Sequence, residues 1–387
     1  MNKKKIYEFV VVFFLTFISF FVYYQSSMYP YKVDRWVQPY EAYLIGATAK
    51  QCSPQLSWLS DIADYAMSER GAYSVQVAFL STDKKSETCS LGYKDKLFGI
   101  QLSDEHRYRY ASTTKLITVA AVMRLKSQKK IDLDDKMIDF FPELSGFKDE
   151  RIRQISVANL LNHSAGFNRL TFKGDPMFLR SNKPWCPSNL SKLQDLILSF
   201  NPSEKQVYSN EAYCLLGEII HRVTGENFRS YIKKEFSLDR RNIKFAESYY
   251  YNDEVRYDYR YEEWYNDSYL TLFDFESIAS SAGMSGSASA LAGLLWDIHH
   301  QQYPSPFSPR FPIKNCDFHE KINCSSFGVF QYQPEKNSMA LYYHEGYLPG
   351  SSSIAVIDSY GGVTVILRSG SDKLSQTTDN QWISWIY

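Results

Sequence analysis

The sequence has no excess of charge of either sign. Its 387 residues include 43 basic and 43 acidic side chains, and no basic block follows the first five positions. Nucleic-acid binding normally needs a concentrated positive surface, so we do not expect nucleic acid as a partner. A glycine-rich phosphate loop is also missing, which argues against a nucleotide-dependent enzyme.

Signature motifs of several hydrolase and metal-site classes are absent as well. No G-x-S-x-G sequence marks an α/β-hydrolase nucleophile. The pair His344-Glu345 does not open a zincin helix, because Leu348 occupies the place of the second histidine. The adjacent His299 and His300 are better explained as helix surface. We therefore predict no metal and no organic cofactor.

Cysteine is scarce, and its spacing excludes the usual zinc and redox motifs. The six cysteines form no C-x-x-C pair and no cluster with histidine. An even count without such motifs favours disulfides, with free buried thiols as the alternative. We predict pairs in sequence order: Cys52 with Cys89, Cys186 with Cys214, and Cys316 with Cys324.

The N-terminus resembles an export signal. Lys3, Lys4 and Lys5 precede an apolar run from Phe9 to Tyr24. A positive flank before a hydrophobic segment places the rest of the chain outside the cytoplasm, periplasmic or extracellular. No clean small-x-small cleavage site follows, so we expect residues 1–28 to stay as a membrane anchor, with a cleaved signal peptide and a secreted protein as the alternative.

The remaining chain is predicted to form a short tether and one large domain. Residues 29–55 are assigned to the tether, with Tyr29 to Pro39 extended, and residues 56–387 to the domain. Leu56 to Ser68 has apolar residues at helical spacing, whereas Tyr73 to Ser81 alternates as a strand does and begins a hairpin with Cys89 to Tyr93.

Helical patterns dominate the middle of the domain, over about residues 105–300. The predicted helices lie in Ala111–Ser127, Val157–Gly166, Leu190–Phe200, Asn210–Gly225 and Leu291–Ile298. Strands return at Ser352–Asp358 and Val363–Ser369, around a glycine turn, and Trp382–Tyr387 is assigned to a short closing helix. This order predicts an α/β (α+β) fold, with one antiparallel sheet formed from both ends of the chain, flanking helices and an inserted, mostly helical region.

Ser112 and Lys115 have the spacing of a nucleophile and its base. Residues three apart lie on one helix face, and the first turn offers unpaired amides to a developing oxyanion. A lysine with a lowered pKa can take the hydroxyl proton. The spacing alone is weak evidence, because it recurs in four other pairs: Ser81 with Lys84, Ser127 with Lys130, Ser145 with Lys148, and Ser230 with Lys233.

Two further segments strengthen the assignment. Tyr208-Ser209-Asn210 directly precedes a predicted helix, so the phenol and the amide can point from a loop into a cleft. His344-Glu345-Gly346 leads into the final hairpin, where a strand can supply a second oxyanion amide, from Tyr347.

Together these motifs resemble the serine β-lactamase and penicillin-binding protein superfamily, in particular the class C β-lactamase-like branch with its DD-peptidases and esterases. The resemblance runs from about Gly71 to Gly370. Its motifs follow the family order: S-T-T-K from Ser112, LLNHSAG from Leu160, Y-S-N from Tyr208, SAGMSGSASALAGLL from Ser281, and HEGYLPGSSS from His344.

The resemblance implies a role for each matched residue. Ser112 is expected to be the acylated nucleophile, assisted by Lys115, and Tyr208 to relay a proton to the leaving group. Asn210 is expected to bind the substrate amide. His344, Glu345, Gly346 and Tyr347 are expected to line the substrate site, with His344 in place of the lysine of the family's K-T-G. His163 of LLNHSAG is expected to be structural.

Two departures from the family pattern affect the predicted substrate. Glu345 replaces a hydroxyl that helps to hold a substrate carboxylate, and His344 has less positive charge than lysine at neutral pH. We therefore predict an exported serine hydrolase that forms an acyl-enzyme with an amide or ester, such as a cell-wall D-amino-acid peptide in peptidoglycan. If the side chain of Glu345 points away from the site, the argument from Glu345 about the substrate no longer applies. The alternative is a peptide- or β-lactam-binding sensor that has lost turnover.

Overall fold

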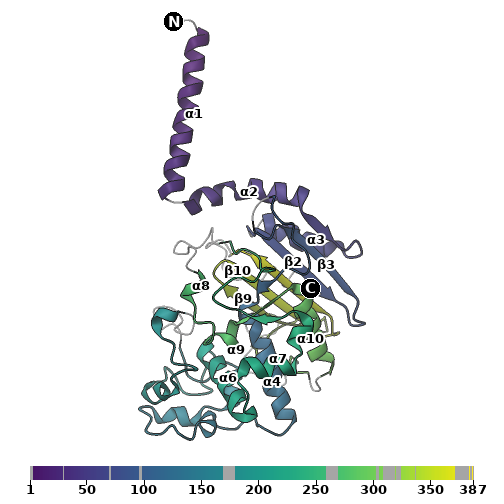
Figure 1. Cartoon of the computed structure of the whole chain (residues 1–387). Helices are drawn as coiled ribbons and strands as arrows, with labels where there is room; N and C mark the ends of the chain where they lie inside the picture. The colour runs from purple at the N-terminus through teal and green to yellow at the C-terminus, as the bar shows by residue number, and fades with distance from the viewer. Residues whose placement is uncertain are drawn as a thin grey trace.

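An antiparallel sheet built from both ends of the chain organises the fold (Figure 1). Its strand order is β1-β3-β2-β11-β10-β9-β8-β7. The strands are β1 (Lys50–Cys52), β2 (Ser74–Leu80), β3 (Ser86–Gly92), β7 (Cys324–Ser325), β8 (Phe330–Tyr332), β9 (Leu341–Leu348), β10 (Ser351–Asp358) and β11 (Val363–Ser369). The pairing of β2 with β11, Val77 opposite Ile366, joins the two ends of the chain.

The computed structural model describes most of the chain. The described residues are 3–28, 30–68, 71–95, 98–168, 179–258, 269–301, 305–307, 319, 324–335, 337–370, 383 and 386. The side chains of the predicted pair Cys316–Cys324 lie outside the described part of the structure. So does most of the predicted helix Trp382–Tyr387.

The inserted region between β3 and β7 is mostly helical, as predicted. Its α-helices are α4 (Thr114–Ser127), α5 (Val157–Leu161), α6 (Asn210–Thr224), α7 (Phe228–Glu235), α8 (Tyr269–Leu272), α9 (Ala279–Ala282) and α10 (Ala288–Gln301). Short 3₁₀ turns are η1 (Ala111–Thr113), η2 (Met137–Phe140), η3 (Glu150–Gln154), η5 (Arg180–Asn182), η6 (Leu190–Asp195) and η7 (Leu238–Arg241). A small second sheet has the order β4 (Tyr108–Arg109), β6 (Met284–Gly286), β5 (Lys244–Phe245).

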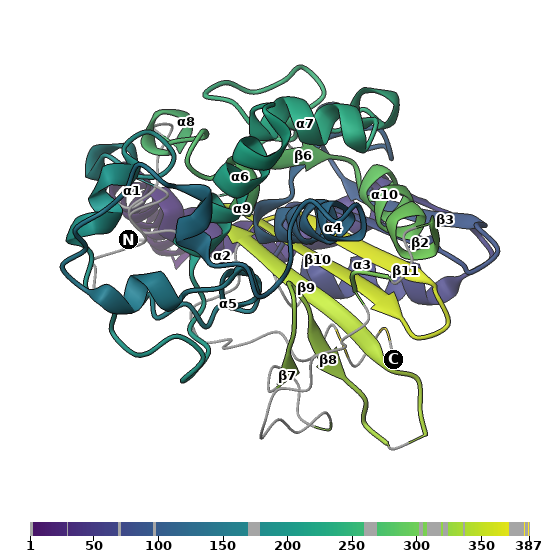
Figure 2. The same ribbon diagram turned by 90° about the horizontal axis from the view of Figure 1, so that it is seen from below.

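The main sheet buries both of its faces. Side chains alternate along a strand, so Ala355 and Val365 face the helical region, whereas Ile354 and Ile366 face the opposite side. The helices α4 and α10 cover the first face (Figure 2). The helix α3 (Ser57–Ser68) packs on the second face, against β2 and β3.

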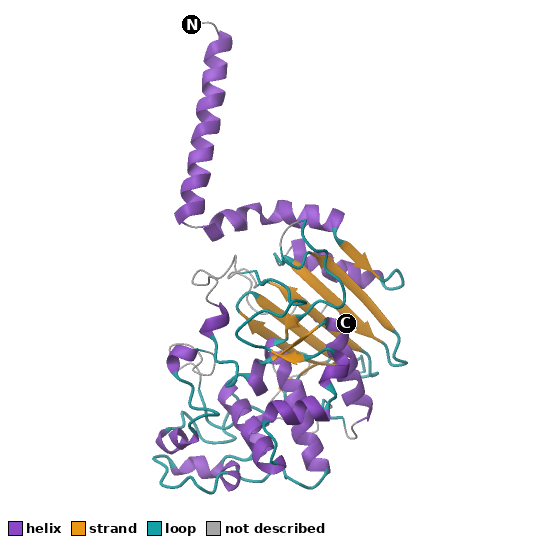
Figure 3. Cartoon of the chain, in the orientation of Figure 1, coloured by secondary structure: helices purple, strands orange, loops and turns teal. Residues whose placement is uncertain are grey.

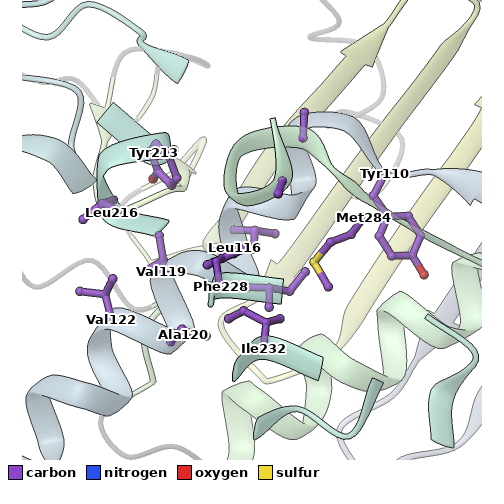
Figure 4. Close-up of a cluster of buried hydrophobic side chains, with 14 of the residues drawn as sticks. Tyr110, Leu116, Val119, Ala120, Val122, Tyr213, Leu216, Phe228, Ile232 and Met284 are labelled. Carbon is purple, nitrogen blue, oxygen red and sulfur yellow. The ribbon is translucent and has the colours of Figure 1, made fainter. Parts of the chain in front are cut away.

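The core of the helical region is formed by α4, α6 and α7. Leu116 and Val119 of α4, Leu216 of α6 and Ile232 of α7 are fully buried in one cluster (Figure 4). The helix α4 is buried on nearly all sides, so its small residues, such as Ala120, allow its neighbours to approach closely. The catalytic candidates are therefore attached to a closely packed helix.

The N-terminal segment is helical where an extended tether was predicted. The helix α1 (Lys3–Met28) projects away from the domain, and α2 (Pro30–Thr48) lies across the surface of the domain (Figure 3). The extended conformation predicted for Tyr29 to Pro39 is wrong, because Pro30 occupies a helix start, where its missing N–H costs nothing, and Ile45 and Ala49 are buried against the domain. A search of the described residues for a helix with the length and hydropathy of a membrane span finds none.

Most other predicted elements are confirmed. The helix at Leu56–Ser68, the hairpin β2–β3 and the final hairpin β10–β11 are present. The predicted helix over Leu190–Phe200 is wrong: the segment forms only the 3₁₀ turn η6, followed by extended residues. Two predicted disulfides are confirmed, Cys52–Cys89 and Cys186–Cys214, and they indicate an oxidising compartment.

Candidate active site

Ser112 lies in the turn η1, directly before helix α4, and neighbouring strands fix its backbone. The amide of Tyr110 donates to the carbonyl oxygen of Met284 on β6 at 2.8 Å. The carbonyl oxygen of Tyr110 accepts a hydrogen bond from the Oγ atom of Ser353 on β10 at 2.6 Å. Ser112 is therefore held between the two sheets, and only 7% of its surface is exposed.

Lys115 is completely buried one turn after Ser112. Its Nζ atom donates to three acceptors: Ser112 Oγ at 3.3 Å, Asn210 Oδ1 at 2.6 Å and the carbonyl oxygen of Ser281 at 2.8 Å. A lysine ammonium has three N–H donors, so these acceptors match the charged form. The Nζ atom also lies 4.7 Å from the centre of the Tyr208 ring, a cation–π contact that further stabilises a buried charge.

Tyr208 completes the contacts of the serine hydroxyl. Its phenol donates to Ser112 Oγ at 2.6 Å. Ser209 caps helix α6, because its Oγ atom accepts the amide of Ala212 at 3.1 Å. This cap starts the helix at Asn210 and leaves Tyr208 on the preceding loop, as the sequence pattern predicted. Tyr208 and Lys115 thus converge on one oxygen atom.

A disulfide braces the helix that positions these groups. Cys214 lies on α6, one turn after Asn210, and is bonded to Cys186. Both residues are buried, and their Cα atoms are 6.2 Å apart. The bond therefore ties the second turn of α6 to a loop 28 residues earlier in the chain.

His163 supports the loop of Tyr208. Its Nδ1 atom accepts the backbone N–H of Ser209 at 3.2 Å, and its ring centre lies 4.6 Å from that of Tyr208. The residue has a positive φ of 60°, which a non-glycine residue seldom adopts without a local reason. This placement agrees with the structural role expected for His163 and shows which residue it supports.

His344 is buried and neutral. Burial, together with the nearby charge of Lys115, lowers its pKa to about 3. Its Nδ1 atom lies 2.7 Å from the carbonyl oxygen of Gly328, and a carbonyl oxygen can only accept. The proton therefore resides on Nδ1, and Nε2 is an acceptor. The predicted loss of positive charge at this position is thus confirmed.

Gly346 brings strand β9 against Ser112. A Cβ atom added at Gly346 would lie 2.6 Å from the carbonyl oxygen of Tyr110 and 2.9 Å from the nitrogen of Ser112. No side chain fits in that space. Tyr347, whose amide is the expected second oxyanion donor, follows Gly346 directly on β9.

Glu345 does not line this site. His344 is opposite Ala355 and Gly346 is opposite Ser353, both on the face that meets the helical region. Glu345 is opposite Ile354, which packs in the core on the α3 side. Side chains alternate along a strand, so Glu345 points away from Ser112, and its expected place in the substrate site is wrong.

Clustered metal-binding side chains are absent from the part of the chain that the structure describes. Within the described ranges, no group of three or more histidine, cysteine, aspartate or glutamate side chains is arranged to hold an ion.

A separate, open cavity of about 480 Å³ lies in the tyrosine-rich segment, lined by Lys244, Tyr249, Tyr250, Tyr251, Asn252 and Asp253. None of the serine-site residues lines it.

Comparison with known families agrees with this geometry. A family model described as Beta-lactamase matches residues 59–381. The chain belongs to the beta-lactamase family. It is accordingly a serine hydrolase of the type that acts on amides and esters. The family prediction made from the ordered motifs is confirmed.

The chain is also similar to two curated proteins. FimD of serogroup D from Dichelobacter nodosus, named as a candidate fimbrial assembly protein, is 32% identical over 358 residues, covering 92% of this chain and 89% of that protein. A candidate D-alanyl-D-alanine carboxypeptidase of Escherichia coli K12 is 28% identical over 137 residues, covering 33% of this chain and 30% of that protein.

Solved structures support the beta-lactamase fold. The D-amino acid amidase of Ochrobactrum anthropi SV3 has a TM-score of 0.67 at 18% identity, covering 85% of this chain and 96% of that chain. A penicillin-binding protein of Bacillus halodurans has a TM-score of 0.61 at 17% identity, covering 77% of this chain and 92% of that chain. At these identities the likeness shows the fold alone.

Sequence reasoning missed several residues that complete the site. The carbonyl oxygens of Ser281 and Gly328 bind Lys115 and His344, and Ser353 holds the backbone next to Ser112. The motif from Ser281 and the serines after Gly350 were noticed as family features. Their contacts, however, depend on backbone geometry that the sequence does not specify.

Proposed function

We propose that Ser112 cleaves an amide or ester through a covalent acyl-enzyme. The observation that carries this proposal is the convergence of Tyr208 and Lys115 on Ser112 Oγ, at 2.6 and 3.3 Å. In the form that reacts, the Tyr208–Lys115 pair has lost one of the protons it holds in the contacts described above. Ser112 Oγ then attacks the carbonyl carbon, and its proton passes to the vacant position on this pair. The amides of Ser112 and Tyr347 receive the oxyanion.

The second half of the reaction uses the same groups. The bond from the carbonyl carbon to the leaving nitrogen or oxygen breaks, and Tyr208 delivers the proton to that atom. Water then attacks the acyl-Ser112 ester, gives its proton to the same pair, and restores the free hydroxyl. Asn210 holds Lys115 and presents its amide N–H to the substrate.

The neutral His344 supports an uncharged acyl chain near the nucleophile. The Nε2 atom of His344 accepts hydrogen bonds, so it favours a donor such as a substrate N–H. A terminal carboxylate of the substrate would instead face the lone pair of Nε2 and would find no cation at this position. We therefore propose an internal amide or an ester as substrate, with a cell-wall D-amino-acid peptide of peptidoglycan as the favoured class. Glu345 plays no part in this preference.

Fimbrial protein is a second candidate source of the amide. The similarity to FimD extends over 92% of the chain, beyond the residues that form the site. FimD is named for fimbrial assembly, so an exported fimbrial peptide belongs in the substrate screen beside peptidoglycan peptides.

We also propose export, with attachment to the membrane through residues 1–28. Three lysines precede the apolar run, and all side chains from Val10 to Phe21 are exposed on α1. Exposed apolar surface of this extent calls for a hydrophobic environment. Cell fractionation tests this: the full-length protein should sediment with membranes and resist alkaline extraction. Recovery in the soluble fraction with an intact N-terminus would contradict it.

The hydrolase proposal is tested by covalent labelling. A fluorophosphonate or a fluorescent penicillin should label the full-length protein, and Ser112→Ala should remove the label. Ser127→Ala is the matched control, because Ser127 has the same spacing to a lysine but lies exposed at the end of α4. A screen of p-nitrophenyl esters, D-peptides and fimbrial peptides then measures turnover. Tight peptide binding without labelling or turnover would identify a sensor.

A further inference from the structure

The helix α2 exposes apolar residues on the face that points away from the domain. The exposed residues whose side chains the structure describes on α2 are Trp36, Val37, Pro39, Tyr40, Tyr43, Leu44, Ala47 and Thr48. None carries a charge. The outward face of a helix on a soluble domain normally holds charged residues.

An aromatic stripe runs along this outward face. With 3.6 residues per turn, Trp36, Tyr40, Tyr43 and Ala47 fall on one line about 16 Å long. The three aromatic side chains are 69%, 72% and 79% exposed. We call these four residues the α2 stripe.

The α2 stripe points directly away from the catalytic domain. The buried residues among the described side chains of α2 are Gln38, Ala42 and Ile45, on the opposite side of the helix, and Ala49 is buried directly after its end. Gln38 fixes this orientation, because its Nε2 atom donates to the carbonyl oxygen of Met67 on α3 at 2.9 Å. Rotation of α2 would break that bond and expose Ile45.

The apolar helix α1 leaves the molecule on the same side. Figure 1 shows α1 rising from the N-terminal end of α2, away from the domain, while α2 lies crosswise beneath it. The α2 stripe therefore faces the region that α1 enters. An apolar layer that surrounded α1 along its length would have its boundary at the α2 stripe.

We propose that the α2 stripe lies in the headgroup layer of a lipid bilayer. Tryptophan and tyrosine concentrate at this layer because each combines an apolar ring with one polar group, and helices lying in the plane of a bilayer bury a face there. Since the stripe is uncharged, its binding does not depend on anionic lipid. This inference rests on the proposed membrane attachment and not on the hydrolase activity.

The geometry also fixes how the domain is held. The helix α2 packs on α3, and α3 packs on the sheet, so a bilayer at the stripe lies on the α3 side of the sheet. The opposite face of the sheet carries the site with Ser112. The serine site then lies on the far side of the sheet from the lipid surface.

The test measures the environment of Trp36 in the full-length protein reconstituted in phosphatidylcholine vesicles. The difference in fluorescence between wild type and Trp36→Phe isolates the Trp36 signal. We expect lipids brominated near the headgroup to quench this signal at least twofold, equally with and without 20% phosphatidylglycerol. Trp296→Phe is the matched control: Trp296 packs in the domain, where its Nε1 atom donates to Ser81, and its signal should not change.

Three results would overturn the proposal. Vesicle-bound protein whose Trp36 is quenched by aqueous acrylamide and not by bromine would place the α2 stripe in water. Protection from both quenchers that grows with the protein-to-lipid ratio would identify a second protein copy as the partner. Failure to bind vesicles would exclude lipid altogether. Fluorophosphonate labelling of the same samples reports the hydrolase separately, so the two proposals can fail independently.

Discussion

Gly346 lies so near the backbone of Ser112 that a Cβ atom added to it would stand 2.9 Å from the serine nitrogen. The strand that carries His344 and the turn that carries the nucleophile are therefore in direct contact. The site tolerates no added atom at this point.

Gly346→Ala should slow acylation on the order of 10²-fold, because the methyl group separates β9 from Ser112 and spoils the oxyanion site. The rate of fluorophosphonate labelling measures this, and circular dichroism checks the fold. Gly46→Ala is the control, since nothing lies within 4 Å of a Cβ at Gly46. Labelling of Gly346→Ala at the wild-type rate would refute the proposed contact.

Asn210→Ala should lower both activity and stability. It removes the 2.6 Å acceptor of the fully buried Lys115. A buried donor left without its acceptor costs about 1–3 kcal/mol, and a misplaced lysine should slow acylation about 10²-fold or more. Asn210→Asp keeps an acceptor and should recover part of the stability. Thermal melts and kcat/KM for an ester test this; equal values for the two variants would contradict the role of the acceptor.

Glu345→Gln should leave acylation and substrate preference unchanged within about twofold, because the carboxylate lies on the far face of the sheet. His344→Gln, one position earlier and on the near face, should change both. The comparison uses paired ester substrates with and without a free carboxylate. A gain in preference for the carboxylate in Glu345→Gln would show that Glu345 reaches the site after all.

Stability should fall in acid, partly because of His344. Its pKa is about 3 in the folded chain and about 6.5 when unfolded, so the unfolded chain binds more protons between these values. The contribution is therefore complete above about pH 6.5 and is lost as the pH falls to 3, by about 5 kcal/mol at most.

Urea titrations at pH 7, 5 and 4 measure this loss. In His344→Asn the decline should be shallower, and Asn can still donate to Gly328. His299→Gln is a necessary comparison, because burial also lowers the pKa of His299, to about 4. A pH dependence of His344→Asn equal to that of the wild type would rule out the neutral, buried His344.

Local patterns in the sequence were sufficient for much of the fold. Alternating and helical periodicities located β2, β3, β10, β11, α4 and α6. The cap at Ser209 and the stop at Gly225, with a φ of 73°, follow from side-chain chemistry that can be read directly. Motif order then placed Ser112, Lys115, Tyr208 and Asn210 together, although they lie up to 98 positions apart.

Other features depend on tertiary contacts that no local pattern shows. Tyr29 to Pro39 is predicted to be extended, but packing of Ile45 and the bond from Gln38 to Met67 stabilise a helix. The face occupied by Glu345 depends on strand register: a shift of one residue would exchange Glu345 with His344. The carbonyl oxygens that bind Lys115 and His344 belong to residues whose side chains carry no signal.

The pairing of β2 with β11 also bears on when the protein folds. The centre of the sheet cannot form until Ile366, the partner of Val77 about 290 residues later in the chain, has been synthesised. Synthesis of that length takes on the order of tens of seconds, and sheets with such distant pairings form slowly. The chain therefore lacks its central sheet until most of it has been made, a state that suits the export proposed above.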